Sequence, residues 1–441
     1  MLTKEQAGAL VAKTLKFSSF PDCTVSISEE EVAYMRFANN GLTSSAVTLE
    51  HTVSVTSTRN FKTGGSSTTD LSDESLKATV RRSEEIAAFA PANPEYMEPL
   101  SRQKYPDYEN WDESTAHARP AQMIGRVKSV ISSAVAKKLI AAGYFERTTY
   151  TRAFANKRGN SGHQRGTDSR LATTIRNSLG TSSGWASHPS VRISEIDGPA
   201  LAARAIDKCL RWSGKPIRLE PGKYTVVLEP TAVGDVVAAV GPSLSARSAE
   251  QGQSFLSKKG GGTLVGSKLF PEIVTLRTDP MDRRYPTSIW STDALPSGPV
   301  TWIDKGVVKN LVYDRYWASQ TGATATTAAN YLVLEGGGAT VADLVKATDR
   351  GLLVTRFWYI RSVNPQTIQL TGLTRDGLFL IEKGEITSPV MNLRFTESVV
   401  RILQNTAMVS ESIRVRGAES TMIAPAIQAH DFIFTSISDA V

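Results

Sequence analysis

Histidine and cysteine are the side chains that most often hold catalytic metal ions, and this sequence has few of them. The five histidines lie at positions 51, 117, 163, 188 and 430, and no two are within ten residues of each other. Local zinc motifs such as HExxH place two imidazoles about one helical turn apart. The two cysteines, Cys23 and Cys209, are isolated, and no CxxC pair occurs. This spacing disfavours a self-contained zinc hydrolase.

Ser182 is a candidate nucleophile because Gly180 to Gly184 fits the pattern GxSxG. A nucleophile elbow needs a helix directly after the serine, and Pro189 argues against a helix there. We therefore interpret the segment as a loop rich in serine and glycine, and keep Ser182 as an alternative. Cys209 lies on the apolar face of a predicted helix, which is typical of a buried structural thiol.

A glycine-rich stretch has part of the spacing of a phosphate-binding loop. Gly261 and Gly266 are separated as in GxxxxGK[ST], but Ser267 precedes Lys268, which reverses the required order. We predict a flexible loop here and no nucleotide site.

Arg361, Arg375 and Asp376 are candidate substrate-binding residues in a segment that otherwise reads as strands and turns. Guanidinium groups suit a peptide carboxylate because they form paired, charge-assisted hydrogen bonds. The alternative interpretation is a hairpin whose polar rim faces solvent.

The composition is typical of an ordinary soluble globular protein. The chain has 441 residues, 41% of them hydrophobic, and 50 Lys+Arg against 43 Asp+Glu give a net charge of +7. No block of like charges occurs, which argues against a nucleic-acid partner. The absence of a signal-like or membrane-spanning run predicts a cytoplasmic protein with no membrane association.

Hydrophobic spacing and capping residues predict the elements that position these side chains. A helix is expected over 4–15 because its apolar residues fall on one stripe, and helices are expected after Ser72, from Pro120 and after Asp197 because each has a helix-start signal. Between them, strands are expected at 24–27, 46–55, 148–155 and 171–176.

The second half is expected to be rich in hairpins. Strand–turn–strand patterns occur at 302–308 and 380–386, a helix is expected over 340–349, and a last strand at 431–437. The predicted fold class is therefore α+β. An N-terminal mixed α/β domain over 1–212 is followed by a β-rich, largely antiparallel C-terminal domain over 213–441.

The second half also resembles the TldD/PmbA family, historically described as gyrase modulators, whose zinc-peptidase branch is TldD and whose companion branch is PmbA, or TldE. The resemblance extends over roughly residues 220–440. It is carried by the order and spacing of several short segments: Pro221 to Leu228, Ala232-Val233-Gly234, Gly252 to Leu256, Gly351 to Val354, Asn364 to Thr367, Arg375-Asp376-Gly377 and Ile381 to Ile386.

What the resemblance implies is a peptidase context with a zinc site that this chain lacks. In TldD-type members an HExxxH motif supplies two zinc ligands and a general base, and a later cysteine supplies the third ligand. Aligned on the family pattern, Pro230 and Asp235 stand in place of the histidines, Thr231 in place of the glutamate, and Arg416 in place of the cysteine. We expect no catalytic residue and no metal in this chain, with Asp235 and Arg416 forming an ion pair.

The leading hypothesis is a non-catalytic TldE-like subunit. It would pair with a TldD-like zinc peptidase, which alone would carry zinc, and act on peptides or unfolded proteins. One alternative is a hydrolase active alone through a non-standard site, and another is a non-enzymatic binding or regulatory protein. A homodimer is also left open.

Overall fold

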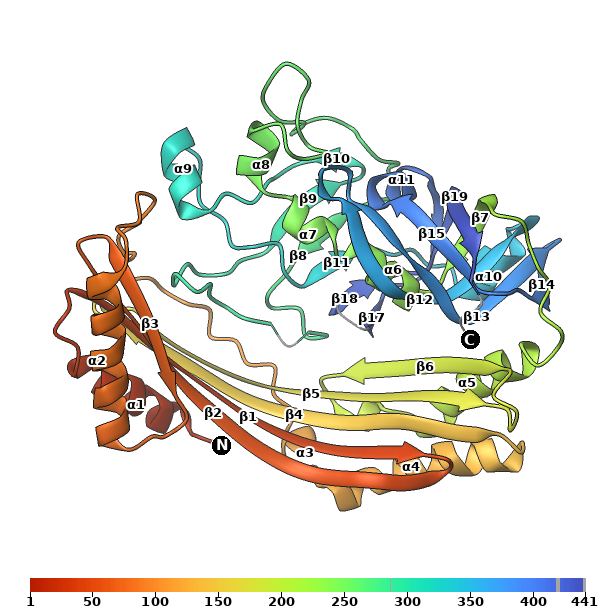
Figure 1. The fold of residues 1–441 in the computed structure, drawn as a ribbon, viewed down its shortest axis with the longest axis horizontal. Coiled ribbons are helices and arrows are strands. Elements are labelled where there is room, and N and C mark those ends of the chain that lie inside the picture. The colour runs from red at the N-terminus through yellow and green to blue at the C-terminus, as the bar shows by residue number, and fades with distance from the viewer. Residues whose placement is uncertain (286, 418–420, 439–441) are drawn as a thin grey trace.

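The structure is a computed structural model that describes residues 1–285, 287–417 and 421–438. These residues form three sheets with helices packed on them. The first half of the chain makes one long curved sheet, and the second half makes two smaller sheets that lie over β5 and β6 of the first (Figure 1).

The long sheet has the order β3-β2-β1-β4-β5-β6, and each pair of neighbours is antiparallel. Its first hairpin turns at Asn39 and Asn40, which both have positive φ (50° and 62°), as a two-residue type I′ turn requires. The strands are longer than predicted. They are β1 (Asp22–Ala38), β2 (Gly41–Arg59), β3 (Lys62–Thr68), β4 (Ile140–Asn156), β5 (Ser161–Arg176) and β6 (Ser183–Ser190).

The helices expected after Ser72 and Asp197 begin at those residues, each of which accepts a hydrogen bond from a backbone N–H of the first turn. Thr3, which was not predicted as a cap, does the same for the first helix. The helices are α1 (Lys4–Lys16), α2 (Asp73–Phe89), α3 (Glu113–Ala116), α4 (Pro120–Ala136) and α5 (Gly198–Arg211), with a 3₁₀ turn η1 (Ile193–Glu195). Helices α4 and α5 pack together against the long sheet, and α5 lies beside the edge strand β6, where it also reaches the second half.

The larger sheet of the second half has the order β12-β7-β19-β15-β13-β14. It closes on itself because β13 also pairs with β12. Its strands are β7 (Gly222–Leu228), β12 (Arg350–Asn364), β13 (Gln369–Glu382), β14 (Glu385–Pro389), β15 (Leu393–Ser398) and β19 (Ile427–Ile437), and β16 (Thr406–Val409) pairs with β19.

The smaller sheet has the order β10-β9-β8-β11-β18-β17. Its strands are β8 (Leu276–Thr278), β9 (Val300–Asp304), β10 (Val307–Val308), β11 (Leu332–Leu334), β17 (Ile413–Arg416) and β18 (Thr421–Ala424). Within the described strands, only β7–β12 and β11–β18 are parallel. The predicted fold class, α+β with a largely antiparallel second half, is confirmed.

Short helices connect the strands of the second half. They are α6 (Pro230–Val237), α7 (Val240–Ser243), α8 (Ala246–Glu250), α9 (Arg315–Thr321), α10 (Val341–Lys346) and α11 (Val399–Gln404), with a 3₁₀ turn η2 (Pro365–Thr367). The helix expected over 340–349 is α10, capped by Thr340. No helix among the described residues is both long and apolar enough to cross a membrane.

The buried apolar side chains fall into separate clusters on the two sides of residue 212. Two clusters draw their buried members from residues 7–209, and the largest draws them from residues 226–434. Trp212 itself packs with Val227 and Leu344 of the second half. The proposed boundary between 212 and 213 agrees with this division but stays a prediction.

The contact between β6 and α5 depends on a glycine. A Cβ atom at Gly184 would lie 2.2 Å from the carbonyl oxygen of Ala205 and 2.6 Å from the amide nitrogen of Cys209. Both atoms belong to the backbone of α5, which cannot move without repacking the core.

We predict that Gly184→Ala destabilises the protein by about 2–3 kcal/mol, because the added methyl group forces α5 away from β6. Gly125→Ala is the matched control, since Gly125 lies inside α4 with nothing within 4 Å of its Cβ position. That change should stabilise the protein by about 0.5–1 kcal/mol through helix propensity. Urea denaturation measures both, and equal midpoints for the two variants would contradict the packing argument.

Candidate functional site

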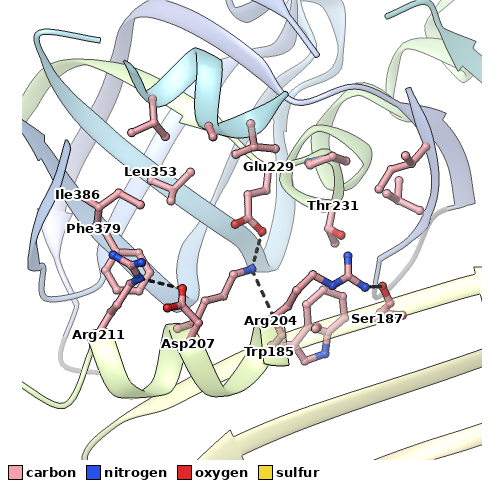
Figure 2. Close-up of a pocket in the computed structure, with 18 of the residues that line it drawn as sticks. Trp185, Ser187, Arg204, Asp207, Arg211, Glu229, Thr231, Leu353, Phe379 and Ile386 are labelled. Atoms are coloured by element: carbon pink, nitrogen blue, oxygen red, sulfur yellow. Dashed lines mark hydrogen bonds and ion pairs between the residues drawn. The ribbon is translucent and has the colours of Figure 1, made fainter. Parts of the chain in front are cut away.

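A cavity of about 710 Å³ lies between the two halves of the chain. One side is formed by β6 and α5 of the first half. The other side is formed by the start of α6, by α10, and by β12, β13, β14 and β17 of the second half (Figure 2). The cavity is of the size that binds small molecules or short peptide segments.

The two sides of the cavity differ in chemistry. The side from the second half is mostly apolar and includes Val341, Val345, Leu353, Phe379 and Ile386. The side from α5 is charged, because that helix buries Leu201, Ala205 and Cys209 and turns its opposite stripe to the cavity. The charged stripe consists of Arg204, Asp207, Lys208 and Arg211.

Ion pairs hold most of these charges. Lys208 Nζ lies 2.6 Å from Glu229 Oε2, and Arg211 Nε lies 2.8 Å from Asp207 Oδ2. Arg204 donates a long hydrogen bond of 3.5 Å to the carbonyl oxygen of Ser187 (Figure 2). The surrounding protein desolvates the Arg204 guanidinium and lowers its pKa, an effect that Glu229 partly opposes.

Three of the four positions of the proposed vestigial metal site line this cavity. Pro230 and Thr231 do so at the start of α6, and Arg416 does so at the end of β17. Asp235 lies one turn further along α6 and accepts a hydrogen bond of 3.1 Å from the Phe357 backbone. The structure therefore gathers Pro230, Thr231 and Arg416 without bringing Asp235 to the cavity surface.

The expected ion pair between Asp235 and Arg416 is wrong. Arg416 Nη1 instead lies 2.8 Å from Glu146 Oε1 on β4 and 4.0 Å from Asp168 Oδ2 on β5. The guanidinium reaches across to the first half because the long sheet supplies two carboxylates at that place.

These residues do not fit a zinc ion. Pro230 has no donor atom, Thr231 offers a neutral hydroxyl group, and Arg416 is a permanent cation that repels a metal. Among the described residues, no group of three or more His, Cys, Asp or Glu side chains could hold a metal ion. No catalytic step through zinc follows from this chain.

Two further arginine–carboxylate contacts surround the cavity. Arg414 donates to both carboxylate oxygens of Asp168, at 2.7 and 2.8 Å, and both residues are buried. Asp376 on β13 accepts hydrogen bonds from Arg356 Nε on β12 and Ser183 Oγ on β6, each at 2.9 Å. Both networks connect the first half to the second.

The structure disperses the three predicted substrate-binding residues. Asp376 is 4% exposed and belongs to the buried network described above. Arg375 lies over the ring of Trp358, 5.0 Å from its centroid, and 3.8 Å from Asp376. Arg361 is exposed and lies over Tyr359, outside the cavity. Their proposed role in substrate binding stays a prediction.

The alternative with Ser182 as a nucleophile is wrong. Its side chain is fully buried, and its hydroxyl oxygen lies 3.4 Å from the sulfur of Cys209. Strand β6 begins directly after it, so no helix forms an elbow. Burial also raises the pKa of the Cys209 thiol, which keeps it protonated, and the predicted structural role of Cys209 agrees with its 0% exposure.

The charged stripe of α5 and Glu229 were missed from the sequence. The signal was present, because positions 204, 207, 208 and 211 repeat with helical spacing opposite the apolar face. A charged stripe usually faces solvent, however, and only the arrangement of the two halves turns this one toward a cavity.

Two family models match the chain. The model of the PmbA/TldA metallopeptidase C-terminal domain matches residues 221–436, and that of the PmbA/TldA metallopeptidase domain 1 matches residues 23–87. Among curated protein sequences, none matches significantly.

Solved structures with the same fold come from an archaeon and two bacteria. TldE from Thermococcus kodakarensis has a TM-score of 0.86 at 18% identity, covering 97% of this chain and 99% of that chain. A putative modulator of a DNA gyrase from Thermotoga maritima has a TM-score of 0.80 at 16% identity, covering 94% of this chain and 96% of that chain. A putative modulator of DNA gyrase from Bacteroides thetaiotaomicron has a TM-score of 0.83 at 19% identity, covering 99% of this chain and 100% of that chain. At these identities the likeness establishes the fold.

We predict that Asp376→Asn destabilises the protein by about 3 kcal/mol, because it leaves the Arg356 guanidinium with no carboxylate in a site where it is 14% exposed. Asparagine keeps the shape and tolerates the positive φ of 55° at this position. Asp207→Asn is the control, since its pair with Arg211 is exposed and should contribute less than about 1 kcal/mol. Denaturation midpoints that fall equally in both variants would contradict this assignment.

Proposed function

The chain belongs to the PmbA/TldD metallopeptidase family, and we propose that it is the non-catalytic, TldE-like subunit of a zinc-dependent peptidase. One observation carries the proposal. Where the resemblance implies three zinc ligands and a general base, this chain has Pro230, Asp235 and Arg416 at the ligand positions and Thr231 at the base, and all of these except Asp235 line the inter-half cavity. The similarity to the TldE structure along nearly the whole chain supports it.

In this proposal the chain contributes binding surface, and a TldD-like partner contributes zinc and the catalytic glutamate. The apolar side of the cavity would hold side chains of an unfolded peptide, because such segments expose apolar groups that folded proteins bury. The charged stripe of α5 would face the peptide backbone, whose polar groups need hydrogen-bond partners when water is displaced. A cytoplasmic location is part of the same proposal.

Co-expression with a TldD-like protein that retains HExxxH tests the pairing. We expect a stable complex by light scattering, about one zinc ion per complex of the two chains, and cleavage of a fluorogenic peptide that a chelator abolishes. The isolated chain should bind no stoichiometric zinc and cleave nothing.

A partner whose HExxxH glutamate is replaced by glutamine is the matched control. The complex should still form but lose cleavage, because only the proton-transfer group has been removed. Residual cleavage by this mixed complex, or by the isolated chain, would favour the alternative in which this chain is itself a hydrolase. Failure to form any complex would refute the companion role.

A further inference from the structure

A second cavity of about 400 Å³ adjoins the first. Ser187, Pro189, Arg204 and Ile413 line both, so β6, α5 and the start of β17 border the two cavities together. A ligand in the larger cavity can therefore extend past Arg204 into the smaller one.

The smaller cavity is strongly basic. Five of its lining residues are arginines, and the carboxylates that pair with them number three within the described chain. Arg414 is held by Asp168 at 2.7 Å, Arg284 by Asp282 at 2.7 Å, and Arg192 by Glu195 at 3.4 Å. The two arginines that remain are Arg204 and Arg283.

Arg204 and Arg283 form no ion pair among the described residues. They come from different halves of the chain: Arg204 lies on α5, and Arg283 lies in the loop after β8. His188, which lines the same cavity, does not add to the positive charge of the two arginines. Its burial, together with Arg204, lowers its pKa and keeps the ring neutral. The two guanidinium groups therefore carry positive charge that no ion pair holds, although Glu229 acts on Arg204 from a longer distance.

We propose that the smaller cavity is an anion subsite in which Arg204 and Arg283 bind a carboxylate of a peptide that lies in the larger cavity. The inference rests on the proposed function, since it specifies the peptides that the companion subunit would take. Guanidinium groups bind carboxylates through paired hydrogen bonds. The carboxylate can belong to the peptide C-terminus or to an aspartate or glutamate side chain.

The larger cavity favours a peptide over a nucleic acid. Its apolar side suits amino-acid side chains, whereas a polynucleotide needs a continuous basic surface for its phosphates. Lys208 and Arg211, which line the larger cavity, are paired with Glu229 and Asp207, so they are not free to bind a chain of phosphates. A peptide with a single terminal or side-chain carboxylate needs only the two arginines of the smaller cavity.

Isothermal titration calorimetry on the isolated full-length chain tests the subsite. The probes are the N-acetylated peptide Ala-Leu-Ala-Phe-Leu-Ala with a free C-terminus, the same peptide as its C-terminal amide, and an amide in which the last alanine is glutamate. We expect the free acid to bind at least about tenfold more tightly than the plain amide. If the glutamate peptide binds as tightly as the free acid, the subsite accepts any carboxylate. If it binds only as weakly as the plain amide, the subsite is specific for the peptide C-terminus.

Substitutions identify the residues responsible. Arg204→Gln and Arg283→Gln should each reduce the affinity for the free acid about tenfold without changing the affinity for the amide. Arg102→Gln, in an exposed loop of the first half, is the control and should change neither. Thermal denaturation confirms that each variant is folded.

Equal affinity for the free acid and the amide would overturn the proposal. A loss of affinity for the free acid in the Arg102 variant as large as in the Arg204 and Arg283 variants would also overturn it. If a single-stranded oligonucleotide displaces the peptide at a concentration below that of the peptide itself, the basic cavity is assigned to nucleic acid instead. The titrations need no partner subunit, so their failure is separate from a failure to form the complex with a TldD-like chain.

Discussion

The arrangement of the two halves depends on a buried ion pair between Asp168 on β5 and Arg414 on β17. Both carboxylate oxygens accept a hydrogen bond from the guanidinium, which fixes distance and orientation together. The free-energy cost of removing such a pair from water is roughly equal to the gain from the attraction between its charges, but removing one partner costs about 3–5 kcal/mol. The pair thus penalises separation of the two sheets at the place where they enclose the two cavities.

Strand β17 extends this connection into the candidate site. Arg416 lies two residues after Arg414, so the alternation of the strand sends both side chains toward the long sheet. Arg416 reaches Glu146 and Arg414 reaches Asp168, which are residues of adjacent strands β4 and β5. On the other side of the cavity, Asp376 joins Ser183 of β6 to Arg356. The position where the family resemblance implies a metal ligand is therefore occupied by a residue that joins the halves.

Local structure could be predicted from the sequence because its causes are local. Ser72 and Asp197 mark helix starts through hydrogen bonds to residues three positions later, and Asn39-Asn40 marks a turn through its own backbone angles. The cavity could not be predicted, since most of its second-half side comes from residues more than a hundred positions after β6 and α5. The burial of Asp376 was missed for the same reason: an Arg-Asp-Gly turn looks exposed unless Ser183, from the other half, is known to cover it.

The arginines also explain why the same place in the fold suits a different ligand. A site for Zn²⁺ needs neutral or anionic donors, and two imidazoles with a thiolate provide them in the TldD-type members that the chain resembles. The resemblance aligns Arg416 with one of these donors, and Arg204 and Arg283 add two cations that form no ion pair among the described residues. A guanidinium group disfavours a bound cation and favours a carboxylate. The misfit of a metal at Arg416 and the proposed anion subsite at Arg204 and Arg283 therefore have the same physical basis, which is an arginine at each position.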